Sequence, residues 1–172
     1  MLTQIGTHIH DRLTGTKTTK NVFGTALDQM YETKVVSLTA DASVFDAAQL
    51  MLSKHVGDIV VVEEKNGQTI PKGIVTDRDI VINTIAQKKD PATIKLSELM
   101  LGQVMTATDQ HSLSDLVRLM TEQEVSRMPI VDDKGALKGI LSSKRLYQFF
   151  AQGLCELSSL SKQQQEREGK RH

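Results

Sequence analysis

The feature that most constrains the fold of this chain is an internal repeat. Six residues of the first half recur 69 positions later as identical residues: Ser43, Asp46, Leu50, Met51, Val56 and Val62 correspond to Ser112, Asp115, Leu119, Met120, Val125 and Val131. Beyond this block the separation falls to 66, because the predicted turn at 63–73 is longer than its counterpart at 132–139. Self-similarity at a fixed period indicates two copies of one structural unit.

Both copies predict the same series of elements. An extended segment precedes an amphipathic helix with a serine cap, and two strands then lead directly into a second helix. In the first repeat we expect strands at 35–38, 59–62 and 73–75, with helices that begin at Ser43 and Thr76. In the second repeat we expect strands at 104–107, 128–131 and 139–141, with helices that begin at Ser112 and Ser142. The predicted fold class is therefore α/β (α+β), with two tandem βαββα repeats.

The repeats divide the chain into four parts. We expect an N-terminal flanking segment at 1–26, a first repeat at 27–90, a second repeat at 91–155, and the end of a helix followed by a flexible tail at 156–172. The link at 88–93 is polar, contains Pro91 and is short, which favours repeats that pack on each other. The flanking segment has apolar residues at helical spacing: Ile5, Ile9, Leu13, Val22, Phe23, Ala26, Leu27 and Met30.

Charge and hydropathy limit the kinds of partner. The chain of 172 residues has 21 Lys and Arg against 21 Asp and Glu, so its net charge is zero and no overall basic field would attract a nucleic acid. Only 3% of the residues are aromatic, which disfavours a stacking surface for single strands. No run is long and apolar enough to span a membrane, and residues 1–13 lack the pattern of a signal peptide. We expect a cytoplasmic protein with no nucleic-acid or membrane partner.

The junction between the last strand and the second helix of the first repeat has a recognisable pattern. It is Gly73-Ile74-Val75-Thr76-Asp77-Arg78-Asp79, and with the second copy it resembles the CBS-domain family, named after cystathionine β-synthase. The resemblance covers about residues 27 to 155. It implies a tandem pair, or Bateman module, in which two repeats pack by pseudo-twofold symmetry and the clefts between them bind adenosine-containing ligands such as AMP, ADP, ATP, NAD or S-adenosylmethionine.

The resemblance also implies roles for individual residues. Asp79 would hold the ribose hydroxyls and Thr76 would face the phosphate, while Arg127, just before a strand of the other repeat, would reach the phosphates. These roles agree with the chemistry, because a carboxylate accepts hydrogen bonds from a cis-diol and a helix N-terminus favours an anion. Asp77 and Arg78 lie in the same turn, where Arg78 either balances charge or contacts phosphate. The walls for the base would come from Val36, Ser37, Leu38, Ile59 and Val60.

A purely structural alternative exists for the junction. Thr76 and Asp79 have nearly the spacing of a capping box, in which both side chains only satisfy free N–H groups of the helix. Strand residues such as Ile59 are in most proteins simply core. The sequence does not separate capping from ligand binding.

The second copy of the junction departs from the family pattern. It reads Gly139-Ile140-Leu141-Ser142-Ser143-Lys144-Arg145, so a cation replaces the ribose-binding carboxylate. Pseudo-twofold pairing would combine Thr76 and Asp79 with Arg127 in one cleft, and Arg145 with Asp58 in the other. We therefore predict one competent nucleotide site and one degenerate site, with Ser142, Lys144 and Arg145 as the candidates for any second binding.

No catalytic or metal site is expected. His8 and His10 have no Cys or acidic partner in a metal-binding pattern, and the single cysteine, Cys155, is predicted to be packed and inert. The sequence has no nucleophile elbow, Walker loop or HExxH motif. We expect a non-catalytic sensor for signal transduction that needs no cofactor and regulates an unidentified protein target. We also expect a homodimer, in which the first helices present Ala47, Ala48 and Met51. The alternative is a ligand-free dimerisation or docking adaptor.

Overall fold

The structure, a computed structural model, describes residues 30–100 and 102–170. The predicted flanking segment at 1–26, with its apolar groups and His8 and His10, lies outside the described residues. No helix in the described part is long and apolar enough to cross a membrane.

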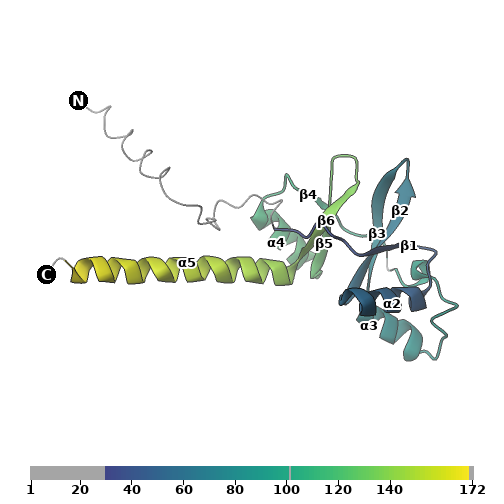
Figure 1. The fold of residues 1–172 in the computed structure, drawn as a ribbon. Helices are drawn as coiled ribbons and strands as arrows, with labels where there is room; N and C mark the ends of the chain where they lie inside the picture. The colour runs from purple at the N-terminus through teal and green to yellow at the C-terminus, as the bar shows by residue number, and fades with distance from the viewer. Residues whose placement is uncertain (1–29, 101, 171–172) are drawn as a thin grey trace.

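Both repeats contain the predicted βαββα series (Figure 1). The elements of the first are β1 (Ser37–Thr39), α2 (Val44–Lys54), β2 (Asp58–Lys65), β3 (Gln68–Thr76) and α3 (Asp77–Ile80), which continues as the π-helix η3 (Val81–Ile85). Those of the second are β4 (Ala107–Thr108), α4 (Leu113–Glu122), β5 (Arg127–Val131), β6 (Leu137–Ser142) and α5 (Ser143–Gly169), and the short 3-10 helix η4 (Leu96–Glu98) lies in the link. The fold class and the order of the elements are confirmed.

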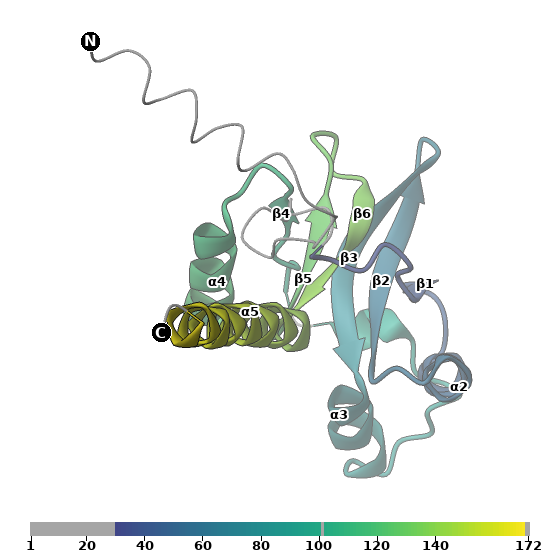
Figure 2. The same ribbon diagram turned by 60° about the vertical axis from the view of Figure 1, so that its left-hand side comes forward.

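Each repeat has its own three-stranded sheet with the same topology. In the order β1-β2-β3 and β4-β5-β6, the first pair of strands is parallel and the second pair is antiparallel. The register shifts at Val61/Val62 in one sheet and at Ile130/Val131 in the other, which are equivalent positions of the repeat. The two sheets meet where β3 contacts β6, and Figure 2 shows this junction between them.

The helix caps follow from the sequence. Ser43 Oγ accepts a hydrogen bond from the Asp46 N–H at 3.1 Å, and Ser112 Oγ accepts one from the Asp115 N–H at 3.1 Å. In both cases the aspartate accepts hydrogen bonds from the cap residue, which completes a capping box. The apolar side of each helix is buried, as Ala47 and Met51 show for α2. Of the three residues that the first helix was predicted to present at a homodimer face, Ala47 and Met51 pack inside their own repeat, so the prediction is wrong for these two, whereas Ala48 is exposed.

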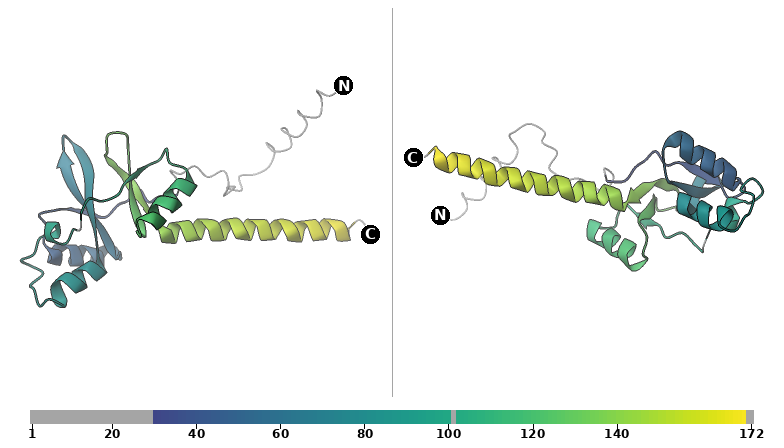
Figure 3. Two further views of the ribbon diagram at one scale, coloured as in Figure 1. Left: turned by 180° about the vertical axis from the view of Figure 1, so that it is seen from behind. Right: turned by 90° about the horizontal axis from the view of Figure 1, so that it is seen from below.

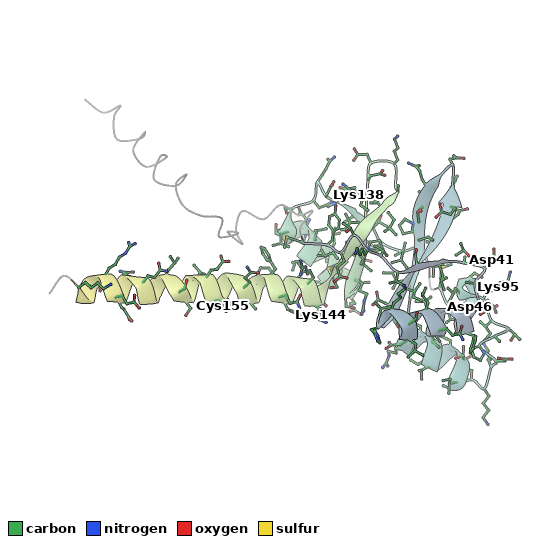
Figure 4. The ribbon with its side chains drawn as sticks, viewed as in Figure 1. Asp41, Asp46, Lys95, Lys138, Lys144 and Cys155 are labelled. Atoms are coloured by element: carbon green, nitrogen blue, oxygen red, sulfur yellow. The ribbon has the colours of Figure 1, made fainter. Side chains whose placement is uncertain are left out.

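The segment before the first strand of each repeat packs in the core of the other repeat. Met30 and Tyr31 precede β1 but belong to the second core, and the Glu32 N–H donates to the Ile140 carbonyl of β6 at 2.9 Å. Conversely, Ile94, Leu96 and Leu99 precede β4 but belong to the first core. The ion pair between Lys95 and Asp41, 2.8 Å apart and labelled in Figure 4, fixes the same link to the first repeat. This exchange joins the repeats into one unit.

The exchange explains the glycine that opens each junction. A Cβ on Gly139 would lie 2.2 Å from Tyr31 Cδ2 and 2.7 Å from the Glu32 carbonyl oxygen, and a Cβ on Gly73 would lie 2.4 Å from Met100 Sδ. Tyr31 and Met100 are equivalent positions of the repeat, 69 residues apart. Only glycine leaves room for the crossing segment at these two places.

Two predicted boundaries differ from the structure. The predicted turn at 63–73 is largely a β-hairpin, because Asn66 and Gly67 take positive φ angles of 53° and 74° and close a tight turn between β2 and β3. The predicted tail also differs, because α5 continues to Gly169 and projects away from both sheets (Figures 1 and 3). Glutamine, glutamate, lysine and arginine dominate its last turns, and these residues have good helix propensity. Cys155, predicted to be packed, is exposed on this helix.

We expect Gly139→Ala to destabilise the protein by about 1–3 kcal/mol, since the methyl group would displace Tyr31 and the Glu32 backbone from the second sheet. Urea unfolding measures this change. Gly169→Ala is the control, because nothing lies within 4 Å of a Cβ at that position. Equal stability of the Gly139 variant and the wild type would contradict the close crossing.

Candidate functional site

The two strand-to-helix junctions have the same geometry. Thr76 Oγ1 accepts a hydrogen bond from the Asp79 N–H at 3.2 Å, and Ser142 Oγ accepts one from the Arg145 N–H at 3.2 Å. The next residue is held equally in both copies, since the Asp77 N–H donates to the Gly57 carbonyl and the Ser143 N–H to the Ser126 carbonyl, each at 2.9 Å. The junctions are thus related by the pseudo-twofold symmetry of the repeats.

The junction of the first repeat has a carboxylate that the second lacks. Asp79 Oδ2 accepts hydrogen bonds from the Thr76 N–H at 2.9 Å and from the Thr76 hydroxyl at 2.7 Å. The capping box that the sequence left open as an alternative is therefore present. It occupies only one carboxylate oxygen, and within the described residues no hydrogen bond is recorded to Asp79 Oδ1. Capping and ligand binding are consequently compatible at Asp79.

A cavity of about 330 Å³ lies at the contact between the repeats. One wall comes from the first repeat through Val36, Val60 and Gly57, and the opposite wall comes from the second repeat through Ser142, Ser143 and Lys144. The start of α5, where Figure 4 labels Lys144, therefore borders the cavity. Cavities of roughly 300–1,000 Å³ are the size that holds a small molecule.

The charged residues of this cavity are of both signs. The cations are Lys34, Arg127 and Lys144, the acids are Glu32 and Asp58, and His55 completes the polar lining. The N-terminus of a 27-residue helix adds a partial positive charge beside Lys144. Anionic and hydroxyl groups of one ligand would thus both find partners.

Asp58 and Arg127 form an ion pair inside the cavity. Arg127 Nε lies 2.6 Å from Asp58 Oδ1, and the side chains are 33% and 18% exposed for Arg127 and Asp58. These residues are equivalent positions, each the first residue of the central strand of its sheet. Residues that are related by a twofold axis and touch each other must lie near that axis. Arg127 therefore lies near the axis that relates the two junctions, and it is the ion-pair partner of Asp58, for which the sequence analysis had suggested Arg145.

The pair sits in an unfavourable setting for a carboxylate. Burial raises the pKa of Asp58, the guanidinium of Arg127 opposes this rise, and the carboxylates of Glu32 and Asp77 add to it. Removing a carboxyl group from water disfavours its charged form, and nearby like charges do the same. The carboxylate that holds Arg127 is therefore partly desolvated and lies near two like charges.

The structure divides the predicted binding residues into groups. Val36, Val60, Arg127, Ser142 and Lys144 line the described cavity. Thr76, Asp77, Arg78 and Asp79 form the equivalent junction of the first repeat and are not in that lining; the Arg78 N–H donates to Asp77 Oδ1 at 2.7 Å.

The other predicted wall residues lie apart from the cavity. Ile59 is fully buried in the first core, Leu38 packs against the same core, and Ser37 in β1 is paired with Val60. None of the three is in the lining of the described cavity.

Several lining residues were missed in the sequence. Glu32 and Lys34 reach the cavity through the crossing segment, and His55 reaches it as the left-handed C-cap of α2, with φ 55°. The signal for the first two was the apolar pair Met30 and Tyr31, which precedes the first repeat as Leu99 and Met100 precede the second. No comparable signal marked His55.

The family profile named CBS domain matches residues 27–83 and 96–151 of this chain, one match for each repeat. The chain belongs to the CBS-domain family. Its two matched segments make it a tandem CBS pair, and the junctions described above lie at equivalent places in them.

Relatives of this CBS pair are known from several organisms. The uncharacterized protein MK0525 of Methanopyrus kandleri is 32% identical over 114 residues, which are 66% of this chain and 57% of that protein. The CBS domain-containing protein YhcV of Bacillus subtilis is 37% identical over 110 residues, 64% of this chain and 74% of YhcV. The chain thus spans little more than half the length of MK0525.

Solved structures share the fold. The hexameric CBS-CP12 protein from bloom-forming cyanobacteria has a TM-score of 0.61 at 27% identity, over 70% of this chain and 68% of that one. The CBS pair of protein MJ0100, solved with 5′-methylthioadenosine and S-adenosyl-L-methionine, has a TM-score of 0.62 at 24% identity, over 74% of this chain and 96% of that one. At this identity the second likeness shows the fold alone.

We expect the setting of Asp58 to appear in the pH dependence of stability. The folded protein keeps a proton on Asp58 at higher pH than the unfolded chain does, so the stability that Asp58 contributes is present at low pH and is lost as the pH rises. Relative to Asp58→Asn, the free energy of unfolding of the wild type should therefore fall as the pH rises above about 4. Denaturant unfolding across this range measures the difference.

Asp109→Asn gives a control of opposite sign. The hydrogen bond from Lys138 lowers the pKa of Asp109, so its contribution is present at neutral pH and is lost as the pH falls. If the Asp58 and Asp109 variants gave slopes of the same sign, the account of Asp58 would be wrong.

Proposed function

We propose that this CBS pair is a non-catalytic regulatory module that binds an adenosine-containing ligand, from the group AMP, ADP, ATP, NAD and S-adenosylmethionine, between its two repeats. Two observations support the proposal: the cavity at the contact between the repeats, which is lined by the junction of the second repeat and by both members of the Asp58–Arg127 pair, and the equivalent junction of the first repeat, which carries Asp79. The complex of MJ0100 with 5′-methylthioadenosine and S-adenosyl-L-methionine supports the ligand class, since that protein has the same fold.

The ribose is assigned to the first junction, which lies outside the lining of the described cavity and is equivalent by symmetry to the junction that lines it. Asp79 keeps one carboxylate oxygen available beside the hydrogen bonds from Thr76, and a cis-diol offers two hydroxyl donors to a carboxylate. In the second junction Arg145 stands at the equivalent position and has no acceptor atom. The first cleft is therefore the one that we propose to be competent.

The phosphate or carboxylate of the ligand is assigned to Arg127. This guanidinium lies near the pseudo-twofold axis, where Asp58 holds its Nε at 2.6 Å. A phosphate could bind the Nη1 and Nη2 donors of Arg127 beside Asp58, or take the Nε donor from Asp58, whose burial disfavours its charged form. The two arrangements of Arg127, on Asp58 or on the ligand, give the module two states that a ligand can bias.

We further propose that the module forms a homodimer and passes its response to a protein target. The large apolar side chains exposed on the helices support self-association, among them Phe45, Leu52, Val81, Ile85 and Leu154. The cyanobacterial CBS-CP12 protein, which is hexameric, supports the same tendency in the fold. The same exposed side chains favour the second candidate function, a docking adaptor that has no ligand.

Calorimetric titration of the nucleotide-free protein with AMP, ADP, ATP, NAD and S-adenosylmethionine tests the proposal. We expect saturable binding of at least one of them, and a loss of affinity of roughly 10- to 100-fold in Asp79→Ala, since a hydrogen bond to a charged group contributes about 1.5–3 kcal/mol. Binding by the wild type that Asp79→Ala retains in full would contradict the assignment to the first cleft.

The matched control is Asp115→Ala. Asp115 completes a capping box with Ser112 at α4, as Asp79 does with Thr76, so both variants lose a helix cap. We expect Asp115→Ala to lose stability but no affinity. If the wild type binds none of the five ligands and remains folded, the adaptor function replaces the sensor function.

A further inference from the structure

Helix α5 has an apolar stripe along its projecting part. Tyr147, Phe150, Leu154 and Leu157 follow one another at spacings of three, four and three residues, and their side chains are 72%, 49%, 68% and 48% exposed. Figure 1 shows that α5 extends beyond the two sheets. The spacing is that of the a and d positions of a coiled coil, which bury such side chains against a second helix. We call these four residues the α5 seam.

The charge pattern around the α5 seam suits a partner of the same sequence. Between residues 146 and 161 the only charged residue is Glu156, which lies off the seam. Ala151 and Ser158, at the flanking e positions, are small and uncharged. Two copies of this helix would therefore meet without repulsion between like charges, whereas a partner recognised by charge would find none along the seam.

The seam continues into a groove beside α4. An apolar cavity of about 370 Å³ lies between α4 and α5 and is lined by Val117, Thr121 and Val125 together with Tyr147 and Phe150 of the seam. Val117 and Val125 are 36% and 37% exposed. The apolar surface thus extends from the body of the protein along the projecting helix without interruption.

This surface is a large part of what an interface needs. An aromatic side chain offers about 150–250 Å², so the exposed shares of Tyr147 and Phe150 amount to roughly 200 Å². Leu154, Leu157, Leu160 and the groove bring the surface to several hundred Å², and a stable interface buries on the order of 800 Å² per partner. A patch of this size on a single chain marks a contact site.

We propose that the α5 seam pairs with the α5 seam of a second copy, in an antiparallel arrangement. This places Tyr147 against Leu157 of the partner and Phe150 against Leu154 of the partner, with the twofold axis near Gln152. The turn of α5 that holds Leu157 and Leu160 then lies at the groove beside the other copy's α4, so that the seam and the groove of both chains are covered. The antiparallel direction also sets the helix dipoles in opposition. The inference rests on the homodimer proposed above and identifies its interface.

Sedimentation velocity of the full chain tests the interface. The wild type sediments as an elongated dimer at micromolar concentration. Leu154→Glu combined with Leu157→Glu places two unpaired charges in the seam and raises the dissociation constant of the dimer by at least about 100-fold. The matched control, Gln148→Glu combined with Ser159→Glu, adds the same charge at exposed positions outside the seam and leaves the dimer intact.

A disulfide tests the direction of the helices. The test uses a Cys155→Ser background. In an antiparallel pair, the cysteines of Ala151→Cys in the two copies lie beside each other and form a disulfide on oxidation. Ser158→Cys occupies the next e position. The two copies of residue 158 are then separated by the length of about 12 helical residues, and they do not cross-link. Equal cross-linking of the two variants overturns the antiparallel arrangement.

The outcomes separate the interface from the homodimer itself. A dimer that survives the paired glutamates overturns the seam but leaves the proposed homodimer standing on another face. A monomeric wild type overturns both, and protection of the seam from hydrogen exchange in that monomer assigns the seam to another part of the same chain. Titration with the five adenosine ligands is independent of either result.

Discussion

The exchange of crossing segments is the constraint on which the rest of this structure depends. Neither repeat completes its own core, because Met30 and Tyr31 fill the second core and Ile94, Leu96 and Leu99 fill the first. The glycines at 73 and 139 make the exchange sterically possible, since any larger residue would collide with Met100 or Tyr31. The relative placement of the two sheets, and thus the cavity between them, follows from these two crossings.

Much of the local structure could be read from the sequence, because it depends on residues that are close together. The serine and aspartate of each capping box, the apolar side of each helix and the order of the elements all recur with the period of the repeat. The parts that were missed depend on contacts between distant segments. The arrival of Glu32 and Lys34 at the cavity, and the pairing of Asp58 with Arg127, both require the crossing to be known.

Two predictions were wrong because they relied on local sequence alone: the C-terminal tail and the outward face of α2. The last residues of α5 are polar and lack an apolar anchor, which is typical of a tail, but they are also residues of good helix propensity that continue an existing helix. Ala47 and Met51 were predicted to face a second copy, although their spacing is equally that of a core-facing stripe. Periodicity gives the side of a helix that is apolar and does not give the surface that covers it.

The ion pair of Asp58 and Arg127 has a consequence for how the two halves of the chain can diverge. Residues on the axis of a duplicated fold face their own duplicates, so two identical halves would place aspartate against aspartate or arginine against arginine at a contact of 2.6 Å. A single substitution on either side turns that repulsion into attraction, and from then on the halves are no longer interchangeable. The two junctions farther from the axis differ in the same way, since one has a carboxylate at residue 79 and the other has a cation at residue 145. A scaffold with twofold symmetry therefore presents two unequal faces to a ligand that binds between its halves.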